Sequence, residues 1–323
     1  MTRKLRWGIL GTGRIAGTFA EALAVLPEME LAAVGSRSSG AAKAFAAKHK
    51  AARTHETYEA LARDPDVDAV YVATPHPFHV DHTILCLRSG KAVLVEKPFA
   101  MNEREALEMV QVARREKRFL MEAMWTHFLP AVERAFALVK QGAIGELRMV
   151  QADFGFRAPF DPKGRLFDPA LGGGSLLDVG VYPVSLATRL FGEPTKIQSA
   201  AVMGKTGVDE QASMLLEYGE GRQALLASAI RAETGHAAVL AGSEGRIRIE
   251  APFWKSQKLT LKEETIDLPF RGNGYPHQAL EVGRCLAEGL TESPAMSLDF
   301  SLSVMRTLDA IRRPWGLRYP ADL

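Results

Sequence analysis

The stretch WGILGTGRIAG, residues 7–17, decides the fold of the first part of the chain. An apolar, strand-like run ends in Gly11-x-Gly13-x-x-Ala16, and a helical pattern begins directly after it. At such a turn the backbone can approach a pyrophosphate, and the helix N-terminus offers it free N–H groups. A plain tight turn is the alternative, but the setting between strand and helix favours dinucleotide binding. We assign to the cofactor Gly11, Gly13, Arg14, Ile15 and Ala16.

Strand-like and helical patterns alternate up to about residue 123. Apolar runs at 5–10, 30–36, 68–74, 92–98 and 119–123 are each separated from the next by a helical pattern. Alternation of this kind predicts a parallel sheet with helices on both faces, which is a doubly wound α/β domain. We therefore expect a cofactor-binding domain over residues 1–123.

After residue 124 the rhythm changes. A helix near 130–141 leads to a strand-like run at 147–156, and a glycine-rich stretch then begins a helix near 174–191. Short apolar runs separated by glycine turns follow, and two helical patterns close the chain. Such runs are typical of an antiparallel meander. We expect a second, α+β domain over residues 124–323, built on a mainly antiparallel sheet.

Composition limits the partners. The 323 residues are 47% hydrophobic and 24% charged, and the formal net charge is +2, which gives no electrostatic reason to expect nucleic acid or a membrane surface. The two cysteines, Cys86 and Cys285, have no paired spacing, so we expect a reducing compartment. Because we find neither a signal-like segment nor an 18-residue apolar run, we expect a cytoplasmic protein that acts on small molecules.

The end of the second strand bears on the choice of cofactor. An NAD enzyme usually has an acidic residue there for the ribose 2′-hydroxyl, but this chain has Ser36 and Arg37. The planar guanidinium of Arg37 can pair with a 2′-phosphate, which favours NADP over NAD. The alternative is a solvated surface arginine.

Three histidines follow the next strand, in VATPHPFHVDH. In an open α/β sheet ligands bind at the carboxyl ends of strands, where Thr74, Pro75, His76 and His79 fall, so we predict that these residues contact cofactor or substrate. An ordinary helix start is the alternative. His79, His82 and Cys86 would share a helix face, but no further ligand set supports a metal site, and we predict none. His82 fits a helix-surface residue.

The stretch VLVEKPFA, residues 93–100, places two opposite charges at the end of a buried strand. Lys97 would project from the carboxyl end of that strand towards the nicotinamide, and Pro98 keeps the strand end extended. Glu96 fits either an ion-pair partner or a cofactor contact. A strand that simply exits to solvent is the other interpretation. Trp125, after the last strand of this domain, fits either a cleft position or packing between the domains.

The helix near 174–191 carries a polar stripe. Asp178, Tyr182, Ser185 and Arg189 lie at spacings of four, three and four, while apolar residues fill much of the rest. The stripe could be only the solvated side of the helix. Hydride transfer at a carbinol, however, needs a group that moves the hydroxyl proton, and a tyrosine near a lysine suits that task because a neighbouring positive charge lowers its pKa.

Together these segments resemble the Gfo/Idh/MocA oxidoreductases over essentially the whole chain. The resemblance rests on GILGTGRIAG, VATPHPFH, VEKPFA and GGGSLLDVGVYP, and it is nearest to the branch of dimeric dihydrodiol dehydrogenases and NADP-dependent D-xylose dehydrogenases. It implies a Rossmann domain, followed by an open-faced sheet that often forms a subunit interface and hence a homodimer or higher oligomer. It also implies that Lys97 meets Asp178 and Tyr182 across the cleft, and a cis bond before Pro98.

Two departures from the family pattern matter. Inositol dehydrogenases commonly have His where this chain has Tyr182, which favours an aldose or dihydrodiol substrate. Many relatives carry Trp-Arg shortly before the glycine-rich stretch, whereas this chain reads RLFDPALGGG, so a cofactor contact from such a pair is not expected here.

The sequence thus predicts an NADP(H)-dependent oxidoreductase acting on a hydroxyl or carbonyl carbon of a sugar, polyol or cyclic diol. Tyr182 is the expected acid/base, Lys97 its electrostatic partner, and Asp178 orients them or a substrate hydroxyl. Reduction of another carbonyl compound, such as 1,5-anhydrofructose or biliverdin, is an alternative. A cofactor-sensing regulator without turnover is a further one, although it would have little need of Lys97 together with Tyr182.

Overall fold

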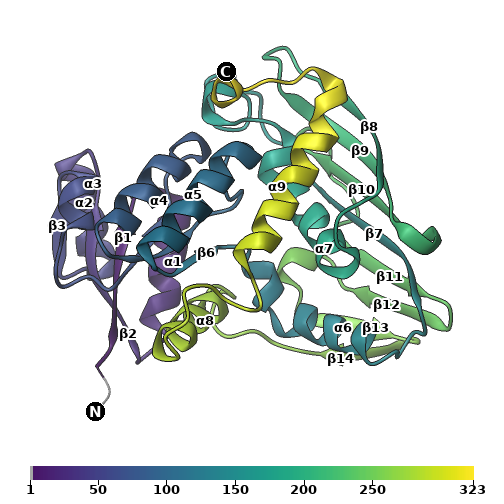
Figure 1. Cartoon of the computed structure of the whole chain (residues 1–323), viewed down its shortest axis with the longest axis horizontal. Helices are drawn as coiled ribbons and strands as arrows, with labels where there is room; N and C mark the ends of the chain where they lie inside the picture. Colours follow the sequence, from purple (N-terminus) through teal and green to yellow (C-terminus); the bar gives the residue numbers. More distant parts are fainter. Residues whose placement is uncertain (1–2) are drawn as a thin grey trace. The chain divides into compact units, whose positions relative to one another are not determined.

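The computed structural model describes residues 3–323, which form two compact units (Figure 1). The first unit contains the described residues up to Ala100, Arg104–Trp125 and Arg271–Ser301. The second contains Met101–Glu103, Thr126–Phe270 and Leu302–Leu323. Residues 271–301, which the sequence analysis groups with the second domain, therefore belong by their contacts to the first unit.

The first unit is built on a six-stranded parallel sheet, as the alternating pattern predicts. Its strand order is β3-β2-β1-β4-β5-β6. The strands are β1 (Leu5–Leu10), β2 (Met29–Gly35), β3 (Arg53–His55), β4 (Ala69–Val72), β5 (Ala92–Val95) and β6 (Leu120–Glu122). The sequence analysis missed β3, because a three-residue edge strand of polar residues has no apolar pattern.

Helices line this sheet, and their apolar faces complete its core (Figure 1). Phe19 is fully buried, where it meets the ring of Trp7 edge-on and stacks on Tyr71. The helices are α1 (Arg14–Ala24), α2 (Ser39–His49), α3 (Tyr58–Ala62), α4 (His79–Arg88), α5 (Glu103–Glu116) and α8 (Pro276–Ala287). Because every βα connection lies at the same edge, the carboxyl ends of the strands gather the predicted cofactor residues.

The second unit contains an eight-stranded mixed sheet in the order β14-β13-β12-β11-β7-β10-β9-β8. The strands are β7 (Leu147–Gly155), β8 (Lys196–Met203), β9 (Asp209–Glu217), β10 (Gln223–Ala229), β11 (Ala238–Gly242), β12 (Gly245–Ile249), β13 (Lys258–Leu261) and β14 (Glu264–Asp267). The prediction of a mainly antiparallel sheet is confirmed. The simple meander is wrong, because β7 lies between β11 and β10 and runs parallel to β10.

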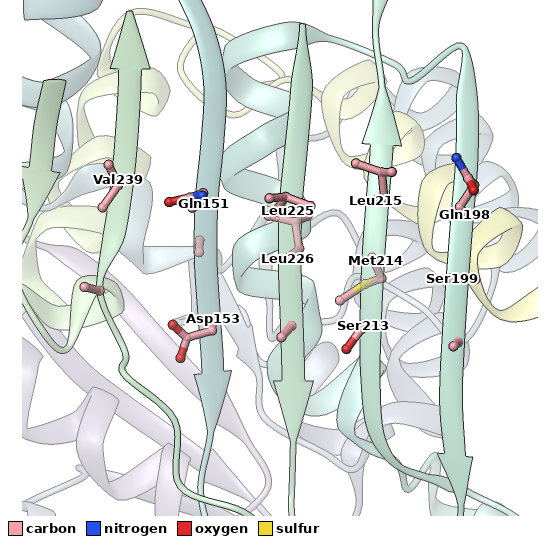
Figure 2. A pocket seen from close by; sticks show the side chains of 14 residues that line it. Gln151, Asp153, Gln198, Ser199, Ser213, Met214, Leu215, Leu225, Leu226 and Val239 are labelled. Atoms are coloured by element: carbon pink, nitrogen blue, oxygen red, sulfur yellow. The ribbon is translucent and has the colours of Figure 1, made fainter. Parts of the chain in front are cut away.

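Helices cover one face of the second sheet and leave the other open. Contacts on the covered face come from α6 (Pro130–Lys140), from α7 (Val181–Phe191) and from the π-helical turn before α7, Leu176–Gly180. The chain closes with α9 (Leu298–Arg312). Figure 2 looks onto the open face, where the side chains of neighbouring strands stand in rows.

One segment has the length and composition of a membrane span. Pro169–Phe191 has a mean hydropathy of 1.2 over its most apolar window, so it comes closer to an apolar run than the sequence analysis states. The same window is 89% buried inside the protein, which is the behaviour of a core helix.

Candidate active site

The glycine turn has the geometry that close approach to a ligand requires. Gly11 has φ +110°, and a β-carbon on it would lie 2.9 Å from the carbonyl oxygen of Ala73, so only glycine fits. Gly13 caps α1 without a side-chain hydrogen bond, and no acidic residue occupies the first turn. The N-terminal N–H groups of α1 are therefore not capped by a side chain, while the buried Ala16 holds the helix against the unit's core. Arg14 is exposed and Ile15 half-buried.

Arg37 lines a cavity of about 420 Å³ at the end of β2. Its guanidinium lies 5.9 Å from the centre of the Phe78 ring, and Thr74 and Pro75 also line the cavity. The neighbouring Ser36 is buried, and its hydroxyl accepts a hydrogen bond from the backbone N–H of Ser38. A cationic donor beside an aromatic ring in a cavity of this size suits a ribose phosphate and a base.

His82 differs from the sequence interpretation of a helix-surface residue. Its ring lines the same cavity, stacks near Phe78 and lies edge-on to Tyr58. Its Nδ1 lies 3.0 Å from the hydroxyl oxygen of Thr74. Burial lowers the pKa of His82, so the ring is neutral at neutral pH. The sequence does not reveal the conformation of the loop before His82. Helical spacing alone therefore could not place its ring in this cavity.

His79 connects the ends of two strands. It is fully buried, with Nδ1 2.8 Å from the carbonyl oxygen of Pro98 and Nε2 2.9 Å from that of Thr74. These hydrogen bonds favour the charged ring, but burial outweighs them and lowers the pKa to about 4. A neutral imidazole carries one N–H and donates to one of the two carbonyls. The half-buried His76 packs edge-on against His79, which leaves His76 the more accessible of the two.

Lys97 is half-buried among acidic groups that hold the strand ends. Glu96 accepts hydrogen bonds from the hydroxyl of Tyr71 and from the backbone N–H of Lys97. Behind them Glu122 accepts a hydrogen bond from Ser301, 2.7 Å away. Burial raises the pKa of Glu122 to about 7, and the adjacent Glu96 adds to this effect while Lys97 opposes it. Sequence reasoning missed Glu122, although it is the one charged residue of FLMEA.

Trp125 is buried and stacks on Tyr275, with ring centres 4.5 Å apart. Tyr275 stands at the start of α8, so this segment and the end of the Rossmann sheet form one hydrophobic contact. Packing within the first unit is therefore one role of Trp125 that the structure shows. A cofactor contact from the same side chain stays a prediction.

In the second unit the predicted catalytic pair is buried. Asp178 and Tyr182 are 5% and 6% exposed, and Ser185 is 1% exposed, so these members of the polar stripe are not a solvated helix side; only Arg189 is exposed. Asp178 lies in the π-helical turn and Tyr182 in the first turn of α7. π-Helical turns of this kind are frequent at functional sites.

Side chains from other segments contact this helix at two points, Asp178 and Ser185. Nη1 of Arg165 donates to Oδ1 of Asp178 at 2.7 Å. Two turns further along, the hydroxyl of Ser185 lies 3.1 Å from Nε2 of the buried His127. Burial lowers the pKa of His127 to about 3, so that ring is neutral.

A buried carboxylate holds the start of the same helix. Oδ2 of Asp209 accepts hydrogen bonds from the backbone N–H of Leu176 and from the hydroxyl of Ser175, both at 2.7 Å. Gly174 has φ +120°, and a β-carbon there would lie 2.2 Å from Oδ1 of Asp209. Burial raises the pKa of Asp209 to about 6 despite these donors. Gly174 is thus explained by contact with this carboxylate, which sequence reasoning missed, whereas a β-carbon on Gly173 would meet the backbone of Leu166 and Asp168.

An aromatic cluster lies beside Tyr182. The ring of Phe154, at the end of β7, is 5.4 Å from that of Tyr182 and stacks on Trp254. His236 meets both Phe154 and Trp254. These rings come from segments far apart in the sequence, so no local pattern could have found the cluster. Its half-buried rings can cover an apolar or C–H-rich face of a ligand.

Among residues 3–323 no group of three or more His, Cys, Asp or Glu side chains could hold a metal ion. The geometry around α1 and the Arg37 cavity does fit a dinucleotide, because it combines a glycine turn, an uncapped helix N-terminus and a pocket at the end of β2 that Arg37 lines together with Glu56 and Glu59. Arg37 would face the ribose phosphate, and the turn at Gly11–Gly13 the pyrophosphate.

Comparison with known proteins agrees with this geometry. Residues 5–124 match the GFO_IDH_MocA oxidoreductase family with its NAD-binding Rossmann fold, and residues 132–248 match the C-terminal domain of the same family. The chain belongs to the Gfo/Idh/MocA oxidoreductase family. It is an NAD(P)-dependent dehydrogenase that acts on CH–OH groups, and the resemblance deduced from sequence is confirmed.

Relatives of known activity cover the full chain. The trans-1,2-dihydrobenzene-1,2-diol dehydrogenase of Xenopus tropicalis is 38% identical, over 98% of this chain and 99% of its own; that of Homo sapiens is 36% identical over the same shares. An aldose-aldose oxidoreductase from Caulobacter crescentus, solved with glycerol, is 28% identical with a TM-score of 0.88, covering 96% of this chain and 97% of its own. A 3-ketoreductase from Actinomadura kijaniata, solved with NADP, is 27% identical with a TM-score of 0.86, covering 96% and 98%.

The buried Asp209 yields a prediction on stability. The pKa of Asp209 in the folded protein is about 6, above the ordinary value of 3.8. Its contribution to the free energy of unfolding is therefore fully present below pH 3.8 and is lost as the pH rises through about 6. Because a pKa difference of one corresponds to about 1.4 kcal/mol, the loss amounts to about 3 kcal/mol. We expect the free energy of unfolding of Asp209→Asn, relative to wild type, to rise by about that amount between pH 4 and pH 7, measured in urea.

The difference between Asp209→Asn and wild type isolates the titration of Asp209. Glu122 titrates in both proteins, so its effect on the free energy of unfolding cancels in that difference. Asp267→Asn, which changes an exposed carboxylate on β14, serves as the control and should show no such slope. A pH-independent difference between Asp209→Asn and wild type would mean that Asp209 titrates normally in the folded protein.

Proposed function

We propose that the chain is an NADP(H)-dependent oxidoreductase that transfers hydride between nicotinamide and the hydroxyl or carbonyl carbon of a sugar, polyol or cyclic diol. The observation that carries the proposal is the position of Lys97, which follows β5 at the carboxyl edge of the sheet, the edge at which the glycine turn follows β1. Relatives that act on dihydrodiols and on aldoses support the substrate class.

The roles of the chain's residues follow from ordinary acid–base chemistry. Bound nicotinamide would supply the hydride acceptor or donor at its C4. Tyr182 takes the proton of the substrate hydroxyl in the oxidative direction and returns it in the reductive one. Lys97 stabilises negative charge on the substrate oxygen and favours the ionised tyrosine. Asp178 orients a substrate hydroxyl or the tyrosine.

The cofactor preference is part of the proposal. Arg37 stands where an NAD enzyme usually has an acidic residue, and it is the cationic member of the cavity at the end of β2. The A. kijaniata 3-ketoreductase, solved with NADP, supports this preference. Glu56 and Glu59 also line the cavity, and Glu56 accepts a hydrogen bond from the hydroxyl of Ser39.

We also propose that the open face of the second sheet joins two copies of the chain. Val239, Gln151, Leu225, Leu215 and Gln198 are successive register partners on five strands, and Figure 2 shows them in one row. Leu225, in the middle of the row, is 42% exposed. A continuous row with apolar members on a flat sheet is suited to a matching face on a second copy.

Turnover tests the function directly. With NADP or NAD and a panel of pentoses, hexoses, polyols, dihydrodiols and dicarbonyls, we expect absorbance of reduced nicotinamide to change with at least one sugar or diol. We expect Lys97→Met and Tyr182→Phe each to lower kcat by about 10²–10⁴-fold, because each removes a group that moves or stabilises the reacting proton. NADPH binding, followed by fluorescence, should be retained in both.

Tyr218→Phe is the matched control for the tyrosine variant. The Tyr218 hydroxyl is buried with no hydrogen-bond partner among residues 3–323, so its removal should leave kcat unchanged. Near-normal kcat in Lys97→Met with cofactor bound would refute the proposed role of Lys97. Tight cofactor binding without turnover on any substrate would instead favour the sensor alternative.

Replacement of Arg37 tests the proposed preference for NADP over NAD. Because a charge-assisted hydrogen bond contributes about 1.5–3 kcal/mol, Arg37→Ala should raise the KM for NADP by about 10- to 150-fold and change the KM for NAD much less. Lys43→Ala removes the same charge from an exposed position on α2, outside the Arg37 cavity, and should change neither KM. Equal effects of Arg37→Ala on both cofactors would show that Arg37 does not read the 2′-phosphate.

The oligomer proposal has its own measurement. We expect light scattering to report a dimer for wild type and a monomer for Leu225→Glu, because a buried carboxylate at the centre of the face is costly to desolvate. Leu107→Glu, at a side chain that is 43% exposed on α5 of the first unit, should remain dimeric. A wild-type monomer at micromolar concentration would refute the proposal.

A further inference from the structure

Arg165 lies on a short loop that is fixed independently of its own side chain. The loop turns at Asp161, whose carbonyl oxygen accepts a hydrogen bond from the N–H of Gly164 at 2.9 Å. Phe167 is buried in a cluster with Ala158 and Ile230. The loop therefore has a backbone turn on one side of Arg165 and a hydrophobic anchor on the other.

The arginine reaches from this loop to the start of the helix that carries Tyr182. Its guanidinium and the carboxylate of Asp178 are 2.7 Å apart, with 52% of the Arg165 side chain and 8% of the Asp178 side chain exposed. A carboxylate removed from water is costly unless a charged donor compensates it. Arg165 is such a donor, and it compensates the Asp178 carboxylate through Nη1 while about half of its own side chain stays in solvent.

A purely structural pairing explains this contact less well. Anchoring of the loop is already provided by Phe167 and by the turn at Asp161. The N-terminus of the helix is already held by Asp209. The ion pair instead acts on Asp178, which lies one turn before Tyr182. The sequence also lacks the Trp-Arg pair that many relatives carry near this point, and Arg165 is the arginine that the RLFDPALGGG stretch begins with.

We propose that Arg165 is a positioning residue of the reaction, which keeps Asp178 ionised and in one orientation while substrate is bound. The inference rests on the proposed function, in which Asp178 orients a substrate hydroxyl or Tyr182. Nη1 of Arg165 donates to Oδ1 of Asp178, and this charge-assisted hydrogen bond favours the ionised carboxylate and holds that oxygen in place. Arg165 contacts neither the reacting carbon nor the cofactor in this proposal and acts only through Asp178.

The test compares kinetics of Arg165→Ala, Asp178→Asn and the double variant. We expect Arg165→Ala to lower kcat about 10- to 100-fold, while the dissociation constant for NADPH stays within about twofold of wild type. The double variant should be no slower than Asp178→Asn alone, because residues that act as a unit are non-additive. Arg165→Lys should recover part of the loss, and millimolar guanidinium should partly rescue Arg165→Ala.

Lys163→Ala is the control variant. Lys163 is exposed on the same loop, and its replacement removes one positive charge while keeping the backbone hydrogen bond from its N–H to Asp161. It should leave kcat unchanged. A kcat loss in Lys163→Ala equal to that in Arg165→Ala would reduce the effect to general charge and overturn the proposal.

Other outcomes would also overturn it. Additive losses in the double variant would show that Arg165 acts on substrate directly or elsewhere, and a large loss of NADPH affinity would make it a cofactor residue. Absence of turnover in the wild-type chain would refute the proposed function itself and is seen without any variant. In that case urea unfolding of the same four proteins still measures the Arg165–Asp178 coupling, and a coupling of zero would overturn the inference.

Discussion

Carbonyl groups beyond the buried ends of parallel strands need donors, and the neutral His79 supplies one N–H to one of two such carbonyls in the first unit. Its ring lies between the carbonyl oxygens of Thr74 and Pro98, which follow β4 and β5. The direction in which Lys97 leaves its strand depends on this contact, because Pro98 is the next residue. A histidine placed in this way is a structural link at the centre of a binding edge, and it leaves the more exposed His76 to face ligands.

In the second unit a carboxylate satisfies buried backbone groups. The N-terminus of a buried helix has N–H groups without intrahelical partners, and Asp209 accepts from Leu176 and from Ser175. Gly174 is required because any β-carbon would collide with that carboxylate. Gly174 is therefore explained by packing under the helix. Gly11 likewise lacks room for a β-carbon, which would lie 2.9 Å from the carbonyl oxygen of Ala73, whereas a β-carbon on Gly13 would meet no atom within 4 Å.

Local chemistry made much of this predictable. Gly11, Gly13 and Lys97 were predicted as site residues because a strand pattern, a turn and a helix pattern occur in the order that a parallel sheet requires. Tyr182 was predicted because a polar residue on an apolar helix is informative. The resemblance to known oxidoreductases then added the relation between these residues, which spacing alone does not provide.

Features that depend on distant segments were missed. Simple alternation along β9 places Asp209 on the open face with Gln211 and Ser213, but an extra residue at the register shift opposite Val202 and Met203 turns it inward. The π-helical turn at Leu176–Gly180 has no sequence signal that separates it from an α-helix. Arg165 and His82 depend on loops whose conformations follow from tertiary contacts.

The titratable groups around the predicted catalytic residues are largely held uncharged at neutral pH. In the first unit burial keeps His79 neutral and raises the pKa of Glu122 to about 7, so the acid behind Lys97 is partly protonated. In the second, His127 is neutral. Charges act strongly in a poorly solvated setting. Protonation of Glu122 removes a negative charge that would oppose Lys97, whereas the neutral His79 adds no second positive charge beside it. The buried polar groups therefore concentrate the electrostatic field of each unit in the few side chains that remain charged, which is the condition for moving a proton at a defined oxygen.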